Sequence, residues 1–426
     1  MTFNDKRPFI FLATLLCAAT ITAQNGINSP YTRYGFGLLS DQSLGANKAM
    51  GGVGYALRST TFINLANPAA ISAVDSLTFM MDAGFTLQNG NFEENGTKVN
   101  AKNASFDYIA LQYRLNKHLG MAIGLLPFSN VGYSFSSYKN YLYPDNESNF
   151  TAYNTFTGDG GLHQLFAGLG TNLTKDLSVG GMFSYLYGDI SHKVSNTFSD
   201  ANIRSRVRYY NTSVTNYKLD LGVQYGINLG KDNRLTLGLT YSLGHKLQAD
   251  AKYIDQVLSS STVQSGDTTT VNNVFSLPHT FGIGAAYQLG SKWTFALDYT
   301  LQKWGECTFF SGEKGYDRNK VSLGVEYYPN GITSRNLLKH IRYRAGAYYS
   351  DPYTRVNGQK GSYEYGFSAG FSIPIVNNYN NRSSVNISGQ YVRVEPKVDG
   401  LIGETYLRLN IGISFNESWF MKLKVN

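Results

Sequence analysis

The sequence has few charged residues and, after its first segment, no long hydrophobic run. Charged residues make up 15% of the 426 residues, whereas about a quarter is usual for a soluble enzyme of this size. Beyond Ile21, no stretch approaches the ~18 consecutive apolar residues that a transmembrane helix requires. Hydrophobic residues reach only 42%. These scarcities argue against both a typical soluble enzyme and a helical membrane protein.

Cysteine and histidine are too scarce and scattered to indicate a catalytic or metal site. Cys17 lies in the N-terminal apolar run, which leaves Cys307 as the one cysteine of the remaining chain, so no disulfide or cysteine-based metal site is expected. The six histidines fall singly. We therefore predict a non-enzyme with no catalytic residues, no metal and no cofactor. The net charge of +8 is spread along the chain, so nucleic-acid binding is not expected.

Residues 1–23 have the layout of a secretory signal peptide. Two basic residues precede an apolar run from Phe9 to Ile21, and Thr-Ala-Gln follows. The run is too short to span a membrane. We expect cleavage after Ala23 and export of the remaining chain.

Alternation of apolar and polar residues is the clearest positive signal. From Tyr217 to Leu229, and again from Leu235 to Leu243, odd positions are apolar and even positions are polar or glycine. A period of two predicts a β-strand with one apolar and one polar face. Because the pattern recurs along the chain, it predicts an all-β, 14-stranded antiparallel transmembrane β-barrel over residues 76–426, with its apolar face toward lipid.

The connections between the predicted strands alternate in length. Short turns such as 116–118 and 174–176 separate long segments rich in Asn, Ser, Thr and Tyr. Long segments of this kind are 88–104, 136–160, 190–216 and 246–276. Short turns on one side and long loops on the other are typical of Gram-negative outer-membrane barrels, with the short side periplasmic. We expect a multi-pass monomer surrounded by outer-membrane lipid and lipopolysaccharide, and inserted by the barrel-assembly machinery with the help of an aromatic cluster near the C-terminus.

Residues 24–75 precede the first predicted strand and do not alternate. They carry little charge and many small residues, as in 51–54 and 63–70. A barrel of fourteen strands leaks unless its interior is filled. We predict that this segment is a plug, or hatch, inside the lumen. A disordered periplasmic tail is the alternative, although such tails usually carry more charge.

Pro127 interrupts the third predicted strand. Proline cannot donate a hydrogen bond to a β-ladder, so it predicts a bulge or kink where neighbouring strands part. The kink is either a local distortion of the strand or a gap in the wall.

The chain resembles the FadL/TodX family of outer-membrane transporters for long-chain fatty acids and other hydrophobic compounds. Matching pieces occur in order along most of the chain. They are Gly51–Ala70 with its Asn67-Pro68-Ala69, Gly124–Phe128, Leu277–Gly284, Trp293–Trp304, Arg344–Tyr348 and Asp351-Pro352. The fold that the resemblance implies is a 14-stranded barrel with an N-terminal hatch, in agreement with the strand count.

The resemblance also implies passive uptake of a hydrophobic small molecule by lateral diffusion. The ligand is caught by extracellular loops, passes to a pocket beside the hatch and leaves through the kink in the third strand. On this reading Gly124, Pro127 and Phe128 belong to the opening, and Asn67 and Pro68 anchor the hatch. Aromatic residues of the second long loop form the capture groove, or else pack that loop against its neighbours: Tyr138, Tyr141, Tyr143, Phe150, Tyr153 and Phe156.

Three alternatives remain open. A general porin fits the charges predicted to face the lumen, but not the plug. A partner barrel of a protein secretion or surface-attachment system keeps the fold and changes the function. An enzyme inside the barrel is the weakest alternative, because it requires catalytic residues to meet across strands. No basic pair for a ligand carboxylate can be assigned. The arginines expected to face the lumen, mostly paired with Asp220, Asp298, Glu326 or Glu364, are Arg114, Arg234, Arg342, Arg344 and Arg408.

Overall fold

The computed structural model describes residues 26–418, apart from 77, 95, 144–148, 260–261, 273–274, 310–312, 330–336, 357, 376–382 and 398–400. The predicted signal peptide and the aromatic cluster near the C-terminus lie outside the described residues.

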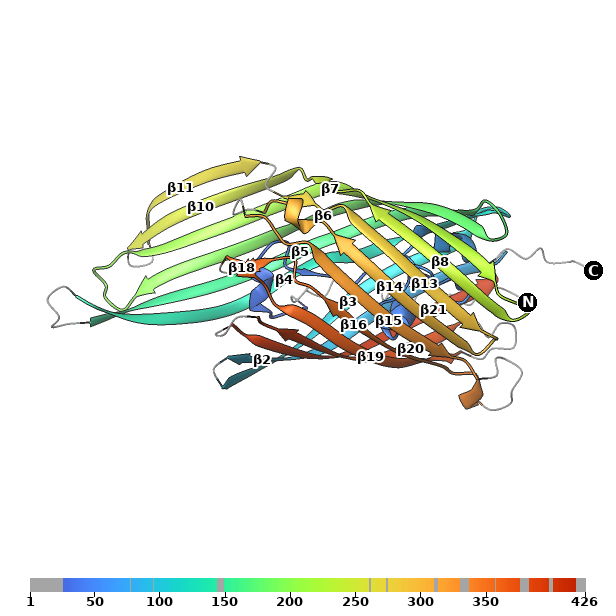
Figure 1. Cartoon of the computed structure of the whole chain (residues 1–426). Coiled ribbons are helices and arrows are strands. Elements are labelled where there is room, and N and C mark those ends of the chain that lie inside the picture. Colours follow the sequence, from blue (N-terminus) through green and yellow to red (C-terminus); the bar gives the residue numbers. More distant parts are fainter. Residues whose placement is uncertain are drawn as a thin grey trace, which may run out of the picture.

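Fourteen antiparallel strands close into a barrel, as predicted (Figure 1). They are β2 (Thr78–Glu94), β3 (Thr97–Arg114), β4 (Leu119–Leu142), β5 (Asn149–Asn172), β6 (Leu177–Phe198), β7 (Ser205–Asn228), β8 (Asn233–Ser242), β13 (Thr280–Leu289), β14 (Trp293–Gln302), β15 (Arg318–Tyr327), β16 (Arg342–Ser350), β19 (Tyr363–Pro374), β20 (Ser384–Glu395) and β21 (Gly403–Ser418). Pairing of β2 with β21 completes the ring.

Shorter elements complete the described chain. Three further strands join the main sheet: β1 (Leu38–Leu39), β10 (Ala249–Ser259) and β11 (Thr262–Asn272). Two small hairpins are formed by β9 (His245–Lys246) with β12 (Ser276–Leu277) and by β17 (Arg355–Val356) with β18 (Gln359–Lys360). The helical turns are η1 (Pro30–Arg33), α2 (Gly45–Lys48), η2 (Pro68–Ala73), η3 (Trp304–Glu306) and η5 (Leu337–Lys339). No helix in the described part of the chain is long and apolar enough to cross a membrane.

The two faces of the wall differ as the alternation predicts. Outward-facing Ile283 and Leu323 expose 55% and 53% of their surface, whereas inward-facing Gln164, Gln224 and Asp298 are almost completely buried. An apolar outer face and a polar inner face are expected when the barrel is surrounded by lipid. The protein is therefore a membrane β-barrel.

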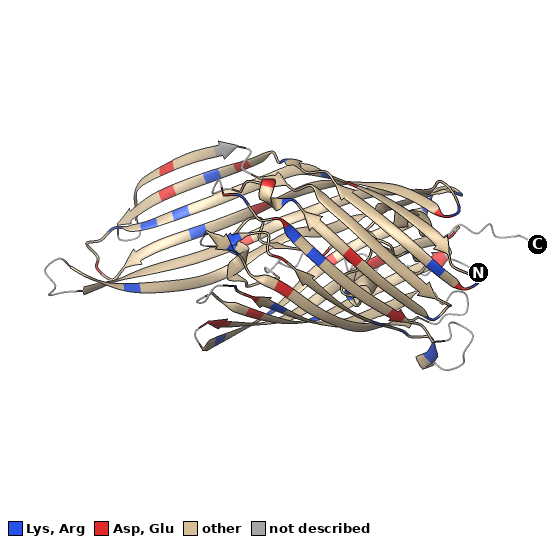
Figure 2. Ribbon diagram, in the orientation of Figure 1, with Lys and Arg blue, Asp and Glu red and all other residues tan. Residues whose placement is uncertain are grey.

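Strands β4 to β7 extend well beyond the rest of the barrel on the side opposite the short turns (Figure 1). β4 has 24 residues and β13 has 10, and 9–11 residues span a bilayer. β10 pairs with β7 and β11 pairs with β10. We call β10, β11 and the adjoining halves of β4–β7 the outer extension. Basic and acidic residues are interspersed on it (Figure 2).

The outer extension corrects one expectation. Residues 136–160, 190–216 and 246–276 were predicted as loops, but most of them belong to strands of the outer extension. Most of residues 88–104, also predicted as a loop, likewise belong to β2 and β3. Beyond the lipid both faces of a strand can be polar, so the alternation that marks the membrane part disappears. Thr and Tyr, which are abundant there, nevertheless favour extended backbone.

Candidate functional site

The barrel wall parts between β3 and β4. Their pairing covers only Ile109–Arg114 against Gly120–Leu125, although both strands continue beyond it. The pairing between β4 and β5 shifts register between Pro127 and Ser129. The bulge predicted at Pro127 is therefore present, because proline has no N–H to continue a regular ladder. Pro127 lies two residues beyond Leu125, the last residue of β4 that pairs with β3.

Part of the free edge of β4 is covered by the N-terminal segment, residues 26–75. β1 pairs with Ser129 and Asn130 of β4. The backbone N–H of Ser40 donates to the Phe128 carbonyl over 3.0 Å, and the side-chain amide of Gln42 donates to the Pro127 carbonyl over 3.2 Å. These bonds satisfy backbone groups that the missing strand pairing leaves open.

Asn67 ties the same segment to β7. Its side-chain oxygen accepts from the Ala69 N–H and caps η2, with Pro68 in the first turn. Its amide donates to the carbonyls of Tyr55 (2.8 Å) and of Val223 on β7 (3.1 Å). One side chain thus joins two parts of the segment to the barrel.

Carboxylates of the wall hold the segment at further points. Asp298 of β14 accepts from the backbone N–H groups of Gly54 (2.6 Å) and Tyr55 (2.9 Å). Lys48 of α2 forms an ion pair with Asp107 of β3 at 2.5 Å. Because these contacts come from well-separated strands, the segment is attached around the inner face of the barrel.

Close backbone contact makes Gly346 of β16 a sensitive position. A Cβ atom there would lie 2.1 Å from the carbonyl carbon of Met50, so Gly346→Ala is expected to destabilise the seated segment by about 1–3 kcal/mol. Hydrogen exchange of residues 45–54 should become faster. Gly389→Ala is the matched control, because no atom lies within 4 Å of its Cβ position. Equal exchange in the two variants would contradict the close packing.

A cavity of about 340 Å³ lies behind the opening. At the wall its lining is apolar and comes from β1 and the bulge region: Leu38, Leu39, Leu126, Pro127 and Phe128. The remaining lining mixes apolar, polar and charged residues, and the charged ones are Asp41, Lys48, Asp107, Lys218, Asp220, Asp298, Arg318, Lys320, Glu364 and Arg408. The cavity therefore has an apolar part at the wall and charged groups of both signs elsewhere in its lining.

Two arginines of this lining have only neutral hydrogen-bond partners in the described part of the chain. Arg318 donates to Ser350 (2.7 Å) and Gln302 (3.3 Å), and Arg408 donates to the side-chain oxygen of Gln88 (2.7 Å). Arginine forms its strongest pairs with carboxylate or phosphate. These two side chains are therefore suited to hold an acidic group in the cavity.

Asp41 of the N-terminal segment provides a negative charge in the same cavity. Enclosure by the barrel raises the pKa of its carboxyl, but the ammonium groups of Lys320 and Lys48 outweigh this effect and hold the pKa below its usual value. Asp41 therefore stays ionised and partly neutralises both lysines.

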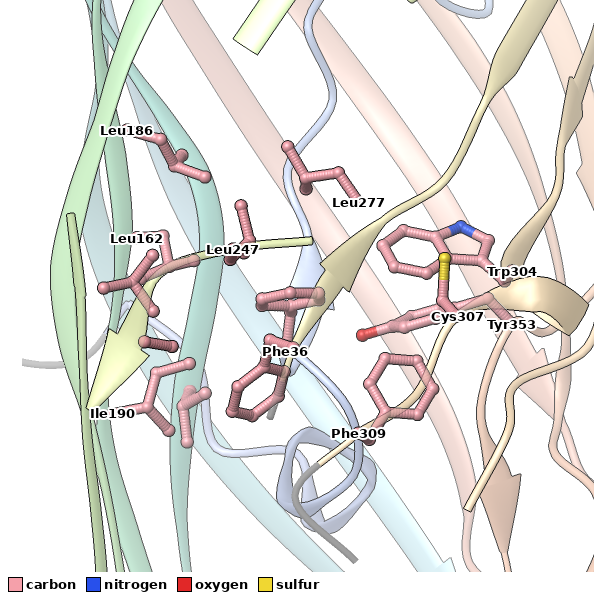
Figure 3. Close-up of a cluster of buried hydrophobic side chains, with 14 of the residues drawn as sticks. Phe36, Leu162, Leu186, Ile190, Leu247, Leu277, Trp304, Cys307, Phe309 and Tyr353 are labelled. Carbon is pink, nitrogen blue, oxygen red and sulfur yellow. The ribbon is translucent and has the colours of Figure 1, made fainter. Parts of the chain in front are cut away.

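Aromatic side chains close the cavity on the side of the long connections. Phe36 is fully buried, and its ring lies 4.8 Å from Phe275 and 5.8 Å from Trp304 (Figure 3). The Trp304 ring lies 4.8 Å from Tyr353, whose hydroxyl donates to the Gly37 carbonyl. Trp304 also lines the cavity, so a ligand entering from this side must displace part of the cluster.

The predicted site residues fall into two groups. Pro68, Pro127 and Phe128 all line the cavity, and Asn67 and Gly124 are their close neighbours in sequence. Four of the six loop aromatics lie apart from it, in and beside the ends of β4 and β5: Tyr138, Tyr141, Tyr143 and Phe150. Tyr138 is 74% exposed, and Tyr141 stacks on Phe150 with ring centres 5.5 Å apart.

The arginine pairings agree only partly with expectation. Arg342 and Arg344 both pair with Glu326, at 2.8 and 2.6 Å. Asp298 and Asp220, however, are occupied by backbone N–H groups and by Lys218, respectively. The backbone donors belong to the N-terminal segment. The alternation of apolar and polar residues in the strands does not predict where this segment lies.

The fold is that of the FadL/TodX class, as three solved structures show. The chain matches the CymD monoaromatic hydrocarbon channel with a TM-score of 0.59 and 14% identity, over 88% of this chain and 98% of that one. The Pseudomonas putida toluene transporter TodX gives 0.58 and 13%, over 89% and 99%. A FadL homologue from Pseudomonas aeruginosa gives 0.56 and 11%, over 90% and 99%.

These similarities confirm the resemblance of the fold that was inferred from the sequence. The chain belongs to the BamG family, whose model matches residues 6–426. A comparison with curated proteins found no match.

Proposed function

We propose that the protein is an outer-membrane channel for passive uptake of hydrophobic small molecules, of the long-chain fatty acid-like kind. The observation that supports this most is the loss of β3–β4 pairing beside a cavity whose rim is apolar. Each Å² of apolar surface removed from water contributes about 25 cal/mol. An acyl chain would therefore pass more favourably from the cavity into lipid than through a charged channel.

In this proposal the parts of the site have separate roles. The N-terminal segment is the hatch, anchored by Asn67 and Pro68, and release is lateral, at Pro127 and Phe128. Arg318 and Arg408 offer a place for an acidic head group while the chain points toward the opening. Tyr138 and its aromatic neighbours remain a proposed site of first contact outside the membrane.

A second candidate function is that of a partner barrel in a protein secretion or surface-attachment system. One observation favours it. The outer extension offers a large surface that uptake of a small molecule does not require. An uptake channel is expected to purify with bound hydrophobic small molecules, whereas a partner barrel is expected to purify with another membrane protein.

Uptake of labelled oleate by cells that lack their own fatty-acid channel tests the proposal. Cells that produce the protein are expected to take up oleate at least tenfold faster than cells with an empty vector. Mass spectrometry of the protein purified in mild detergent should then detect retained acyl compounds. No uptake, together with a stoichiometric co-purifying membrane protein, would instead support the partner barrel.

A further inference from the structure

A second cavity, of about 680 Å³, opens on the side of the short turns, which we assign to the periplasm. Its lining includes four basic side chains, Arg58, His118, Lys175 and Arg234. No aspartate or glutamate is present among the described residues that line it. This distribution differs from the central cavity, where acidic and basic residues are mixed.

Arg58 of the N-terminal segment has its hydrogen bonds filled by neutral groups. Its guanidinium donates to Ser178 (2.7 Å) and Gln224 (3.1 Å) of the wall, and to Ser72 (3.1 Å) and Asn172 (3.1 Å). No ion pair joins it to a carboxylate in the described part of the chain. Partial burial lowers the pKa of Arg58 to about 10, and repulsion from the charge of Arg234 is a second, smaller cause. The cleft therefore holds a cation that a bound anion would stabilise.

Arg234 approaches the same cavity from β8. Its guanidinium packs over Gly226, where a Cβ atom would lie 2.2 Å from one of its nitrogens. The nearest acidic partner is Asp176, at 3.6 Å, with the two side chains 37% and 41% exposed. Such exposed, loosely spaced pairs are weak, so the guanidinium remains able to bind another anion.

We propose that this cavity binds a phosphate group, with Arg234 as its main hydrogen-bonding ligand, the positive charge of Arg58 beside it, and His118 and Lys175 at its rim. Guanidinium groups match the oxygen geometry of phosphate and bind it with paired hydrogen bonds. Arg58 belongs to the N-terminal segment and Arg234 to the wall, so the bound anion links the two. Occupancy therefore holds the segment in place from the periplasmic side. The site is independent of the ligand that the central cavity takes.

Titration calorimetry with inorganic phosphate, on the full chain in detergent at constant ionic strength, tests the site. Arg234→Gln is expected to weaken binding at least tenfold and to leave the contacts of the N-terminal segment intact. Arg58→Gln removes the neighbouring positive charge and should weaken binding too, but it also removes the hydrogen bonds to Ser72 and Asn172. Arg234→Gln is therefore the decisive variant. Lys231→Gln, in the neighbouring turn and outside the cavity lining, is the matched control and should bind as the unchanged protein does.

Hydrogen exchange of residues 54–74 provides a second readout and separates the two sources of phosphate. Protection by inorganic phosphate, lost in the Arg234→Gln variant, indicates a free anion. Protection in nanodiscs that contain phosphatidylglycerol but not in uncharged ones, again lost in that variant, indicates a lipid headgroup. If neither source protects these residues, or if Arg234→Gln and Lys231→Gln behave alike, the site does not exist.

Discussion

Oxidation of a Leu39→Cys, Ser129→Cys double variant is expected to reduce oleate uptake at least tenfold, and reduction is expected to restore it. Leu39 of β1 lies opposite Ser129 of β4, where the wall has lost its pairing with β3. If the ligand leaves here, β1 must move away from this edge. A covalent link between the two strands prevents that movement and leaves the rest of the barrel unchanged.

The geometry of this pair suits a disulfide. Ser40 donates its N–H to the carbonyl of Phe128, the residue opposite it. The next pair, Leu39 with Ser129, is then of the non-hydrogen-bonded type, in which the Cα atoms are ~4.5 Å apart and the side chains are closer. This spacing lies within the range of natural disulfides. The native Cys307 is buried in the aromatic cluster and can be kept.

A disulfide elsewhere on β4 provides the matched control. Ser136 and Thr155 are paired across β4 and β5 in the outer extension, and their hydroxyl oxygens are 3.1 Å apart. A Ser136→Cys, Thr155→Cys variant should form its disulfide without slowing uptake. Normal uptake by the oxidised Leu39–Ser129 variant would show that the ligand does not leave beside β1.

The barrel could be predicted from the sequence because its membrane part follows a local rule. Each strand places apolar residues outward at every second position, as Leu221 and Val223 do, and this pattern needs no knowledge of the neighbours. The outer extension was not predicted because the alternation of apolar and polar residues holds only where one face of the strand contacts lipid. Strand length beyond that point depends on pairing, for example of β7 with β10, between segments that are distant in sequence.

The geometry of the candidate site was predictable only in part. Pro127 predicted the bulge because proline has no N–H to donate to a neighbouring strand, whatever its position in the strand. The pairing of Leu38 and Leu39 with β4 could not be predicted, because a strand of two residues is too short to show alternation of apolar and polar residues. Arg318 could not be distinguished from the paired arginines, because whether an arginine has a carboxylate partner depends on contacts between strands.

Replacing Glu326 with glutamine is expected to lower the free energy of unfolding by about 3–5 kcal/mol. The carboxylate of Glu326 pairs with both Arg342 (2.8 Å) and Arg344 (2.6 Å), and the Arg344 side chain is only 2% exposed. The substitution leaves a buried guanidinium without its counter-ion, which costs more than the lost contact alone. Urea titration of the reconstituted protein, followed by tryptophan fluorescence, measures the change.

An exposed ion pair supplies the comparison for this effect. Glu93 of β2 pairs with Lys98 of β3 at 3.6 Å, and the two side chains are 45% and 70% exposed, so Glu93→Gln should leave the unfolding midpoint unchanged within error. Replacing Glu326, Arg342 and Arg344 together with neutral residues of similar size should recover much of the loss, because no unpaired charge remains. If Glu326→Gln proves as mild as Glu93→Gln, water must reach Arg344, and the inner wall is less tightly closed at this point than the packing indicates.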